Sequence, residues 1–336
     1  AAGGTLVKHY KDMAFMGFIP VLLNLGTILD NMKACQEEIR QYRPDVVILI
    51  DYPGLNLKIA KYVKTQLGLP VYYYISPKIW AWKQYRIKDF RRYVDRMFCI
   101  LPFEVEFFRS LDYPVDYVGN PSVDSVAGYM AKQTDTPDTF RQDERLDERP
   151  ILALLAGSRR QEIKGNLPTM LKVAAAYPGH QPVIAGAPGL EPEYYRQYIG
   201  DADVKIVFGK TYPLLSHSDA ALVTSGTATL ETSLFRVPQV VCYHIAAGKL
   251  ASFVFRHFFH TKYISLVNLI AGREVVQELF GARFSYNQIH DELGRVLNDP
   301  AYRNRMLDGY DGIIRQLGKP GASRRTAELI YQSLKH

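Results

Sequence analysis

Short apolar runs that alternate with amphipathic stretches are the feature of this sequence that most limits its fold. We expect strands at Asp45–Ile50, Val71–Ile75, Arg96–Leu101, Val115–Val118, Ile151–Ala156, Pro182–Ala185, Val204–Phe208, Ala220–Thr224 and Gln239–Tyr243. Helical patterns lie between most of these runs. Strands that are almost continuously apolar and separated by helices are typical of parallel sheets covered on both faces. The pattern therefore predicts the α/β class.

A polar segment divides the chain. Residues Lys132–Pro150 read KQTDTPDTFRQDERLDERP and are almost free of apolar side chains. Since 336 residues are enough for two domains of ordinary size, we predict two doubly wound parallel-sheet domains with a cleft between them. The first covers residues 1–148 and the second 149–318, and residues 319–336 form a C-terminal helix that packs back on an N-terminal domain.

Charge and cysteine content narrow the function only slightly. The 41 basic residues exceed the 34 acidic ones, a surplus that suits nucleic acid, anionic lipid or a phosphorylated ligand equally well. Cys35, Cys99 and Cys242 are far apart in apolar surroundings, so we expect thiols in a reducing compartment and no disulfide.

The longest uncharged run is Met13–Leu29, MAFMGFIPVLLNLGTIL. It is shorter than the roughly 20 apolar residues that a membrane span needs. Its apolar side chains, Met16, Phe18, Leu22 and Leu25 among them, recur on more than one side of a helix. Two interpretations remain open: a buried or partner-covered helix, and a helix that lies in a bilayer interface.

Ligands of open parallel sheets bind outside the carboxyl ends of the strands. In the second half, two strand ends carry small polar residues: Gly157, Ser158 and Arg159 after one, and Ser225, Gly226, Thr227 and Thr229 after the other. A helix that begins near Thr227 offers backbone N–H groups to a phosphate, and Arg159 adds a bidentate donor. Glu231, about one turn into the helix, could bind a ribose diol. We predict a nucleoside diphosphate site, with an ordinary helix cap at Ser225 or Thr227 as the alternative.

A third junction lies in SLVNLIAGREVVQEL. We expect Asn268 in a loop, followed by Gly272 and Arg273 before another amphipathic helix. Asn268 could contact a base or a phosphate, or it could merely shape a turn.

The first half offers a carboxylate and a basic aromatic stretch. Asp51 ends the most apolar strand, where it could act as a general base or as a turn or helix cap. The stretch Lys78–Arg96 interleaves Trp80 and Trp82 with basic residues such as Arg86. It could bind nucleic acid or the phosphate of a lipid head group, or it could be a solvated helix with both tryptophans in the core.

A possible metal motif is unconvincing. Asp201 and Asp203 have the DxD spacing, but they precede a strand instead of following one. We expect a solvated turn there and no metal site.

Six segments together resemble one family. In chain order, SPKIWAWKQYR, LPFE, VGNP, LAGSRRQEI, TSGTATLE and SLVNLIAGRE resemble the motifs of lipid-A-disaccharide synthase. The resemblance implies the GT-B fold, with two Rossmann-like domains, and catalysis without a metal or other cofactor. It also implies an inverting transfer of 2,3-diacylglucosamine from UDP to the 6-hydroxyl of a 2,3-diacylglucosamine 1-phosphate, which yields a β-1,6 disaccharide and UDP.

The resemblance assigns roles to the residues above. Asp51 matches the family's candidate base, and Arg159 is the second expected catalytic residue. The expected UDP-binding residues are Gly157, Ser158, Arg159, Ser225, Gly226, Thr227, Thr229, Glu231, Asn268, Gly272 and Arg273. The expected acceptor- or membrane-facing residues are Met16, Phe18, Leu22, Leu25, Trp80, Trp82 and Arg86.

The same resemblance sets the expected partners and location. They are the UDP-diacylglucosamine donor, the acylated glucosamine 1-phosphate acceptor and an anionic membrane surface, without nucleic acid; a homodimer is compatible. The expected location is cytoplasmic, peripheral on the inner face of the cytoplasmic membrane of a Gram-negative bacterium.

The sequence also departs from the family. The family begins with a strand and a glycine-rich GE-x-SGD loop, and this sequence starts after that point. If the omission is real, we expect the first sheet to lack a central strand. Ala156 stands where many members have proline, and Gly54 where many have an acidic residue. Rival hypotheses are a UDP-sugar 2-epimerase or another GT-B UDP-sugar transferase and, from another class, a nucleic-acid or membrane-binding module.

Overall fold

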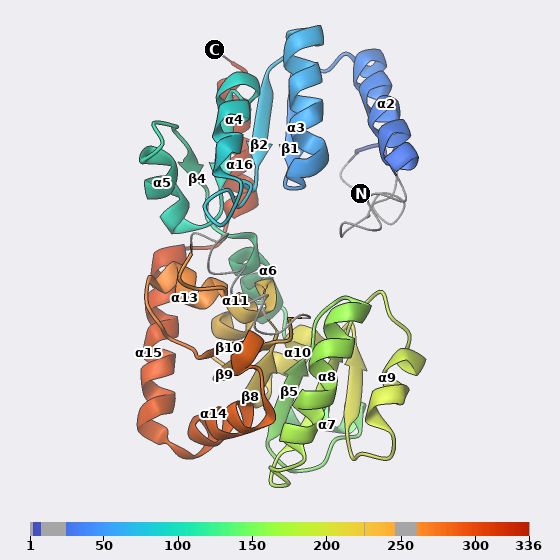
Figure 1. Cartoon of the computed structure of the whole chain (residues 1–336), viewed down its shortest axis with the longest axis vertical. Helices are drawn as coiled ribbons and strands as arrows, with labels where there is room; N and C mark the ends of the chain where they lie inside the picture. The colour runs from blue at the N-terminus through green and yellow to red at the C-terminus, as the bar shows by residue number, and fades with distance from the viewer. Residues whose placement is uncertain (1–2, 8–24, 225, 246–260, 336) are drawn as a thin grey trace. The chain divides into compact units, whose positions relative to one another are not determined.

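The chain folds into two compact units. The computed structural model describes residues 3–7, 25–224, 226–245 and 261–335. The first unit contains Ala1–Ile79, Lys83–Cys99 and Val105–Asp116, and the second contains Trp80–Trp82, Ile100–Glu104 and Tyr117–His336. The strands form two parallel sheets with helices packed against them (Figure 1). The α/β class predicted from the sequence is therefore confirmed.

The first sheet has the strand order β1-β2-β3-β4. The strands are β1 (Val47–Ile50), β2 (Val71–Tyr74), β3 (Arg96–Cys99) and β4 (Asp116–Tyr117); the helices are α2 (Leu25–Tyr42), α3 (Pro53–Tyr62), α4 (Ile87–Tyr93) and α5 (Pro102–Arg109). Pro53 opens α3, where the N–H that proline lacks would have no partner within the helix. Apolar side chains of the strands and helices form one core that includes Tyr73, Phe90 and Phe108.

β1 lies at one edge of this sheet, and its two faces differ. Successive side chains of a strand point to opposite faces. Val47 and Leu49 are buried in the core, whereas Ile48 and Ile50 are 43% and 56% exposed. The second face of β1 is thus apolar and accessible in the part of the chain that the structure describes.

The second sheet has six strands in the order β10-β9-β8-β5-β6-β7. The strands are β5 (Ile151–Leu155), β6 (Gln181–Gly186), β7 (Lys205–Phe208), β8 (Ser218–Val223), β9 (Gln239–Tyr243) and β10 (Glu278–Phe280). The helices are α6 (Pro121–Met130), α7 (Pro137–Glu144), α8 (Arg160–Ala174), α9 (Pro192–Ile199), α10 (Thr211–Ser216), α11 (Thr227–Leu234), α13 (Leu266–Ala271), α14 (Tyr286–Asn298), α15 (Pro300–Leu317) and α16 (Ala322–Ser333). Every residue of β5 is buried, as expected for a central strand covered on both faces.

All nine predicted strands are present, but the sequence analysis missed β10. It predicted an amphipathic helix after Arg273, and this prediction is wrong. A short apolar run such as the one after Arg273 does not distinguish a strand from a helix by periodicity alone. Pairing decides the outcome, because Glu278–Phe280 adds in parallel to the outer side of β9.

The last helix, α16, is fixed by residues from much earlier in the chain. The carboxylate of Asp124 accepts hydrogen bonds from the N–H groups of Gly321, Ala322 and Ser323, at 2.6, 3.1 and 3.2 Å. Arg325 donates to the carbonyl of Val118 at 2.9 Å. A carboxylate at a helix N-terminus is favourable because unpaired N–H groups and the positive end of the helix dipole meet there.

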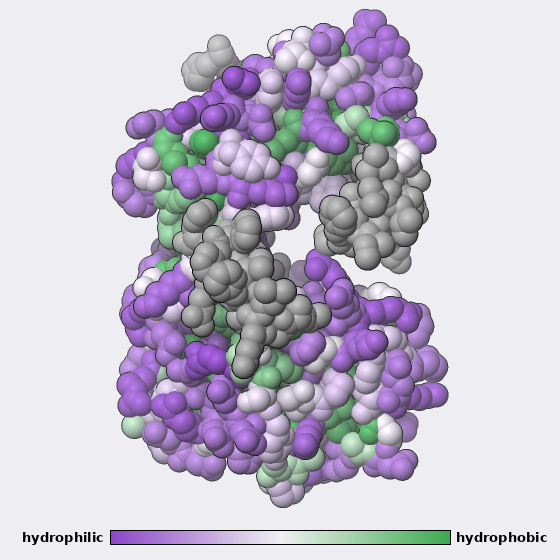
Figure 2. Space-filling model, viewed as in Figure 1, coloured by the Kyte–Doolittle hydropathy of each residue, from purple (hydrophilic) through white to green (hydrophobic). Residues whose placement is uncertain are grey.

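Polar side chains cover much of the face that Figure 2 shows, as expected when the apolar strands are buried. None of the described helices is both long and apolar enough to cross a bilayer. Cys35, Cys99 and Cys242 are free thiols.

Candidate functional site

Asp51 follows β1 directly, at the carboxyl end of the first sheet. Asp51 and Tyr52 both have left-handed backbone, with φ of 46° and 44°. This conformation costs a residue other than glycine about 1–2 kcal/mol. The side-chain amide of Asn56 donates to the carbonyls of Ile50 and Asp51, at 3.0 and 2.7 Å, and the hydroxyl of Tyr73 also donates to the Asp51 carbonyl. The exposed Asp51 is thus held in a strained conformation by specific partners, as is common at functional sites.

The neighbouring strand end is strained in the same way. Ile75 follows β2 and has φ of 64°, which is a genuine outlier for a β-branched residue. Its N–H donates to the carbonyl of Phe98 at 3.1 Å, so the strand pairing continues through the strained residue. Sequence reasoning missed this feature, because Ile75 looks like an ordinary strand residue.

The two tryptophans have different environments. Trp80 is buried, and its indole N–H donates to Glu104 at 3.0 Å. The other carboxylate oxygen of Glu104 accepts two backbone N–H groups of the preceding turn. Trp82 is 47% exposed, and Arg86 is half-buried in the same stretch. Trp80 therefore stabilises the fold, and Trp82 is the tryptophan that a ligand or surface could reach.

The loop between β5 and α8 carries Gly157, Ser158 and Arg159, as predicted. Gly157 has φ of 119°, and a Cβ there would lie 2.6 Å from the Cβ of Glu162, so only glycine fits. The N–H groups of Ser158 and Arg159 donate to the Glu162 carboxylate at 3.0 and 3.3 Å. These two N–H groups are therefore already occupied by a carboxylate of the same chain. The Arg159 guanidinium also donates to Glu162 Oε1, at 3.4 Å, but the Arg159 side chain is 59% exposed, so it is the group of this loop that can reach a ligand.

Helix α11 begins at Thr227, where the sequence predicted a phosphate-binding helix start. Gly226 precedes it with φ of 130°, a conformation that favours glycine. Thr229 is buried, and its hydroxyl donates to the carbonyl of Gly226 at 2.9 Å, which stabilises the first turn. Thr227 is exposed at the helix start. Ser225 lies outside the described residues.

Glu231 is oriented by a tyrosine that the sequence analysis did not select. The hydroxyl of Tyr212, on α10, donates to Glu231 Oε1 at 2.8 Å. The Tyr212 ring packs against the rings of Tyr129 and Phe235, with centroids 5.7 and 5.2 Å away. Tyr212 and Glu231 are far apart in sequence, so no local spacing could have revealed the pair.

Burial of Glu231 should make stability depend on pH. Desolvation raises the pKa of its carboxyl above the ordinary 4.5, although the Tyr212 hydrogen bond lowers it in part. The folded state therefore holds this proton to higher pH than the unfolded state, so the contribution of Glu231 to stability falls as pH rises above 4.5. We expect Glu231→Gln to gain stability relative to wild type as pH rises from acidic to neutral. Urea unfolding at several pH values measures this, with the exposed Glu193→Gln as control; a difference independent of pH would contradict it.

Asn268 lies in helix α13, not in a loop, and it is completely buried. Its amide donates to the carbonyl of Val276 and to Glu278, both at 2.9 Å. Its oxygen accepts the N–H groups of Val275 and Val276 at 2.7 and 3.1 Å. Asn268 thus fixes the loop between α13 and β10. Gly272 caps the helix with φ of 64°, and Arg273 is exposed in that loop.

The remaining residues selected from the sequence are either outside the described residues or in ordinary structural positions. Met16, Phe18 and Leu22 lie outside the described residues, and Leu25 is the first residue of α2. Asp203, of the DxD motif, forms an ion pair with Arg149 at 2.6 Å in the turn before β7. The described ranges contain no group of three or more His, Cys, Asp or Glu side chains that could hold a metal ion.

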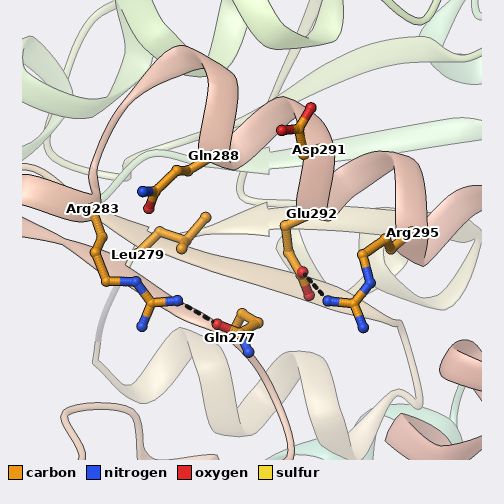
Figure 3. Close-up of a pocket in the computed structure, with 7 residues that line it drawn as sticks. All are labelled: Gln277, Leu279, Arg283, Gln288, Asp291, Glu292 and Arg295. Carbon is orange, nitrogen blue, oxygen red and sulfur yellow. Dashed lines mark hydrogen bonds and ion pairs between the residues drawn. The ribbon is translucent and has the colours of Figure 1, made fainter.

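Two pockets in the second unit differ in their relation to these residues. A pocket of about 740 Å³ lies beside α8 and the end of β9, and Arg159, Lys164, Tyr243 and His244 line it. A smaller one of about 340 Å³ lies between β10 and α14 (Figure 3). In the smaller pocket Arg283 donates to Gln277 and Arg295 pairs with Glu292. Only the larger pocket contains a predicted site residue, Arg159.

The two parallel sheets with helices packed against them place the chain in the α/β class, with a fold of the GT-B type. Solved structures agree on the fold. The co-structure of S. aureus MnaA with UDP has a TM-score of 0.64 at 13% identity and covers 91% of this chain and 80% of its own. The UDP-GlcNAc 2-epimerase from Neisseria meningitidis bound to UDP-GlcNAc has a TM-score of 0.59 at 14% identity, with coverage of 95% and 84%. At such low identity, the likeness concerns the fold alone.

Sequence comparison identifies the family within this class. The chain belongs to the lipid-A-disaccharide synthetase family, whose model matches residues 1–329. The lipid-A-disaccharide synthase of Myxococcus xanthus (strain DK1622) is 38% identical over 341 residues, which is 99% of this chain and 87% of the relative. That of Syntrophus aciditrophicus (strain SB) is 35% identical with the same coverage. The chain is therefore a glycosyltransferase of lipid A biosynthesis, as the motifs predicted.

Proposed function

We propose that this enzyme transfers 2,3-diacylglucosamine from UDP to the 6-hydroxyl of 2,3-diacylglucosamine 1-phosphate, with inversion at the transferred carbon. The products are a β-1,6-linked disaccharide and UDP. The observation that carries the proposal is the family match over residues 1–329, together with an accessible guanidinium at the β5 strand end. Residues 149–318 would bind the donor, residues 1–148 the acceptor and the membrane, and residues 319–336 would support the N-terminal domain.

On the donor side, the chain must stabilise the charge of departing UDP. As the glycosidic C–O bond breaks, the sugar gains oxocarbenium character and the diphosphate gains negative charge. Arg159 and the N–H groups at the start of α11 would stabilise that charge. Glu231, oriented by Tyr212, would accept hydrogen bonds from the ribose diol.

On the acceptor side, Asp51 would take the proton of the 6-hydroxyl as its oxygen attacks the anomeric carbon. A carboxylate that acts as a general base must be within reach of the proton that it takes. Asp51 is exposed, and the hydrogen bonds from Asn56 and Tyr73 to its backbone carbonyl hold the backbone that carries this carboxylate, which supports the role.

The substrates carry acyl chains, so the enzyme would work at an anionic membrane surface. The exposed Trp82 and the basic residues around it would contact lipid head groups, as aromatic and basic side chains do at membrane interfaces. We propose peripheral binding to the inner face of the cytoplasmic membrane, and a homodimer is compatible with this arrangement.

The rival UDP-sugar 2-epimerase function rests on fold likeness at 13–14% identity, whereas the family match covers nearly the whole chain. Fold likeness at that level is a weak guide to activity. The epimerase hypothesis predicts that water-soluble UDP-GlcNAc alone is converted, without an acceptor.

The test is a direct assay. The protein is incubated in detergent micelles with UDP-diacylglucosamine and the acylated sugar phosphate, and products are identified by mass spectrometry. We expect free UDP and the disaccharide in equal amounts, with and without EDTA. Activity that requires magnesium would contradict the metal-independent mechanism, and epimerised UDP-sugar without disaccharide would favour the rival.

A further inference from the structure

One buried amide joins the carboxyl ends of three adjacent strands. Asn166 lies on α8 and is completely buried. Its Nδ2 donates to the carbonyl of Ala156 and to the hydroxyl of Thr224, both at 3.0 Å. Its Oδ1 accepts the N–H of His244 at 2.7 Å. Ala156, Thr224 and His244 follow β5, β8 and β9, which are neighbours in the sheet.

The three residues that Asn166 binds lie next to the proposed donor-binding residues in the sequence or in the larger pocket. Ala156 precedes Gly157 and the Arg159 loop, and Thr224 lies three residues before Thr227, where α11 begins. His244 lines the larger pocket together with Arg159. Packing is tight at this point, because a Cβ on Gly165 would lie 2.8 Å from Nδ1 of His244. The helix therefore lies against the end of β9, where Asn166 can reach all three partners.

We propose that Asn166 is a positioning residue for the glycosyl transfer: it holds the β5, β8 and β9 strand ends in one arrangement, so that Arg159 and the start of α11 meet the diphosphate together. The inference rests on the proposed function. Asn166 is completely buried, and its two hydrogen bonds from Nδ2 to Ala156 and Thr224 are buried as well. A buried donor that loses its partner is costly, so this part of the arrangement is well defined. Donors fixed before the substrate arrives need no reorganisation during the reaction.

The test compares Asn166→Leu, which keeps much of the volume but makes no hydrogen bond, with wild type. UDP affinity is measured by calorimetry and turnover by the disaccharide assay, both well below the unfolding temperature. We expect kcat/KM for the donor to fall by on the order of 10- to 100-fold, because small displacements of reacting groups are that costly. The Kd for UDP should rise, and the KM for the acceptor should not change. If Asn166 had a purely structural role, the substitution would lower the unfolding temperature but would not raise the Kd for UDP while leaving the KM for the acceptor unchanged.

Two further variants keep the test decisive. Gln181→Leu removes a buried amide at the amino end of β6, where it accepts the N–H of Asp147, and should cost stability without changing UDP affinity. Thr224→Val removes one of the three partners and should weaken UDP binding to a smaller extent; it decides the question if Asn166→Leu does not fold. If the folded Asn166 and Thr224 variants bound UDP and turned over substrate as well as wild type does, the inference would be overturned, but the proposed function would stand. No UDP binding by wild type would overturn the proposed function and this inference with it.

Discussion

Arg159→Ala is expected to lower kcat by roughly 100-fold or more, the typical loss when one donor to a developing negative charge is removed. The exposed guanidinium lies at the start of α8, beside the pocket that it shares with His244. The N–H groups of Ser158 and Arg159 already donate to Glu162, so they cannot readily replace it. Turnover of donor and acceptor in micelles measures the effect.

The adjacent arginine provides a matched control. The Arg160 guanidinium lies 4.6 Å from the centre of the Tyr194 ring, so its role is packing. Arg160→Ala should leave kcat close to wild type although it removes the same charge one residue away. Arg159→Lys should fall between wild type and alanine, since a lysine keeps the charge but not the bidentate donor. If Arg159→Ala and Arg160→Ala lowered kcat equally, the loss would come from removing a positive charge anywhere in this region. The specific role of Arg159 would then be excluded.

Local pattern was sufficient for nine of the ten described strands, and for the glycines and the helix start that follow strands of the second sheet. The predicted helix start at Thr227 is where α11 begins, and Gly157 and Gly226 both adopt backbone that favours glycine. These features are readable because an apolar run followed by glycine and small polar residues is itself the signal. Glu162 could also have been found, since a glutamate in the first helical turn often binds the preceding N–H groups.

The rest depends on contacts between segments far apart in the chain. Asn166 binds residues 10, 58 and 78 positions away, and Tyr212 is 19 positions from Glu231. An isolated asparagine inside a helical pattern gives no sign of such partners. Asn268 was misplaced for a different reason. Its partners lie only 7 to 10 positions further along the chain, but they belong to a segment that was predicted as a helix and that instead leads into β10, which pairs with β9.

Asp51→Asn is expected to stop turnover while leaving UDP affinity nearly unchanged. Loss of a general base costs about 100- to 10,000-fold, and none of the donor-side residues lies in this sheet. Asparagine is the informative replacement because it tolerates left-handed backbone, so the strained turn at φ 46° should persist. Alanine would remove the carboxylate and disturb the turn together. Turnover and calorimetric UDP binding are measured on the same preparation.

The carboxylate and its geometry can then be separated. Asp45→Asn, at the other end of β1, is exposed and should change neither quantity. Asn56→Ala keeps the Asp51 carboxylate but removes two hydrogen bonds that hold the turn, so it should lower kcat less than Asp51→Asn does. Undiminished turnover of Asp51→Asn would exclude Asp51 as the base. The two variants remove the carboxylate and the support of its strained backbone one at a time. If Asn56→Ala were fully active and Asp51→Asn inactive, the reaction would need the Asp51 carboxylate but not the strained backbone.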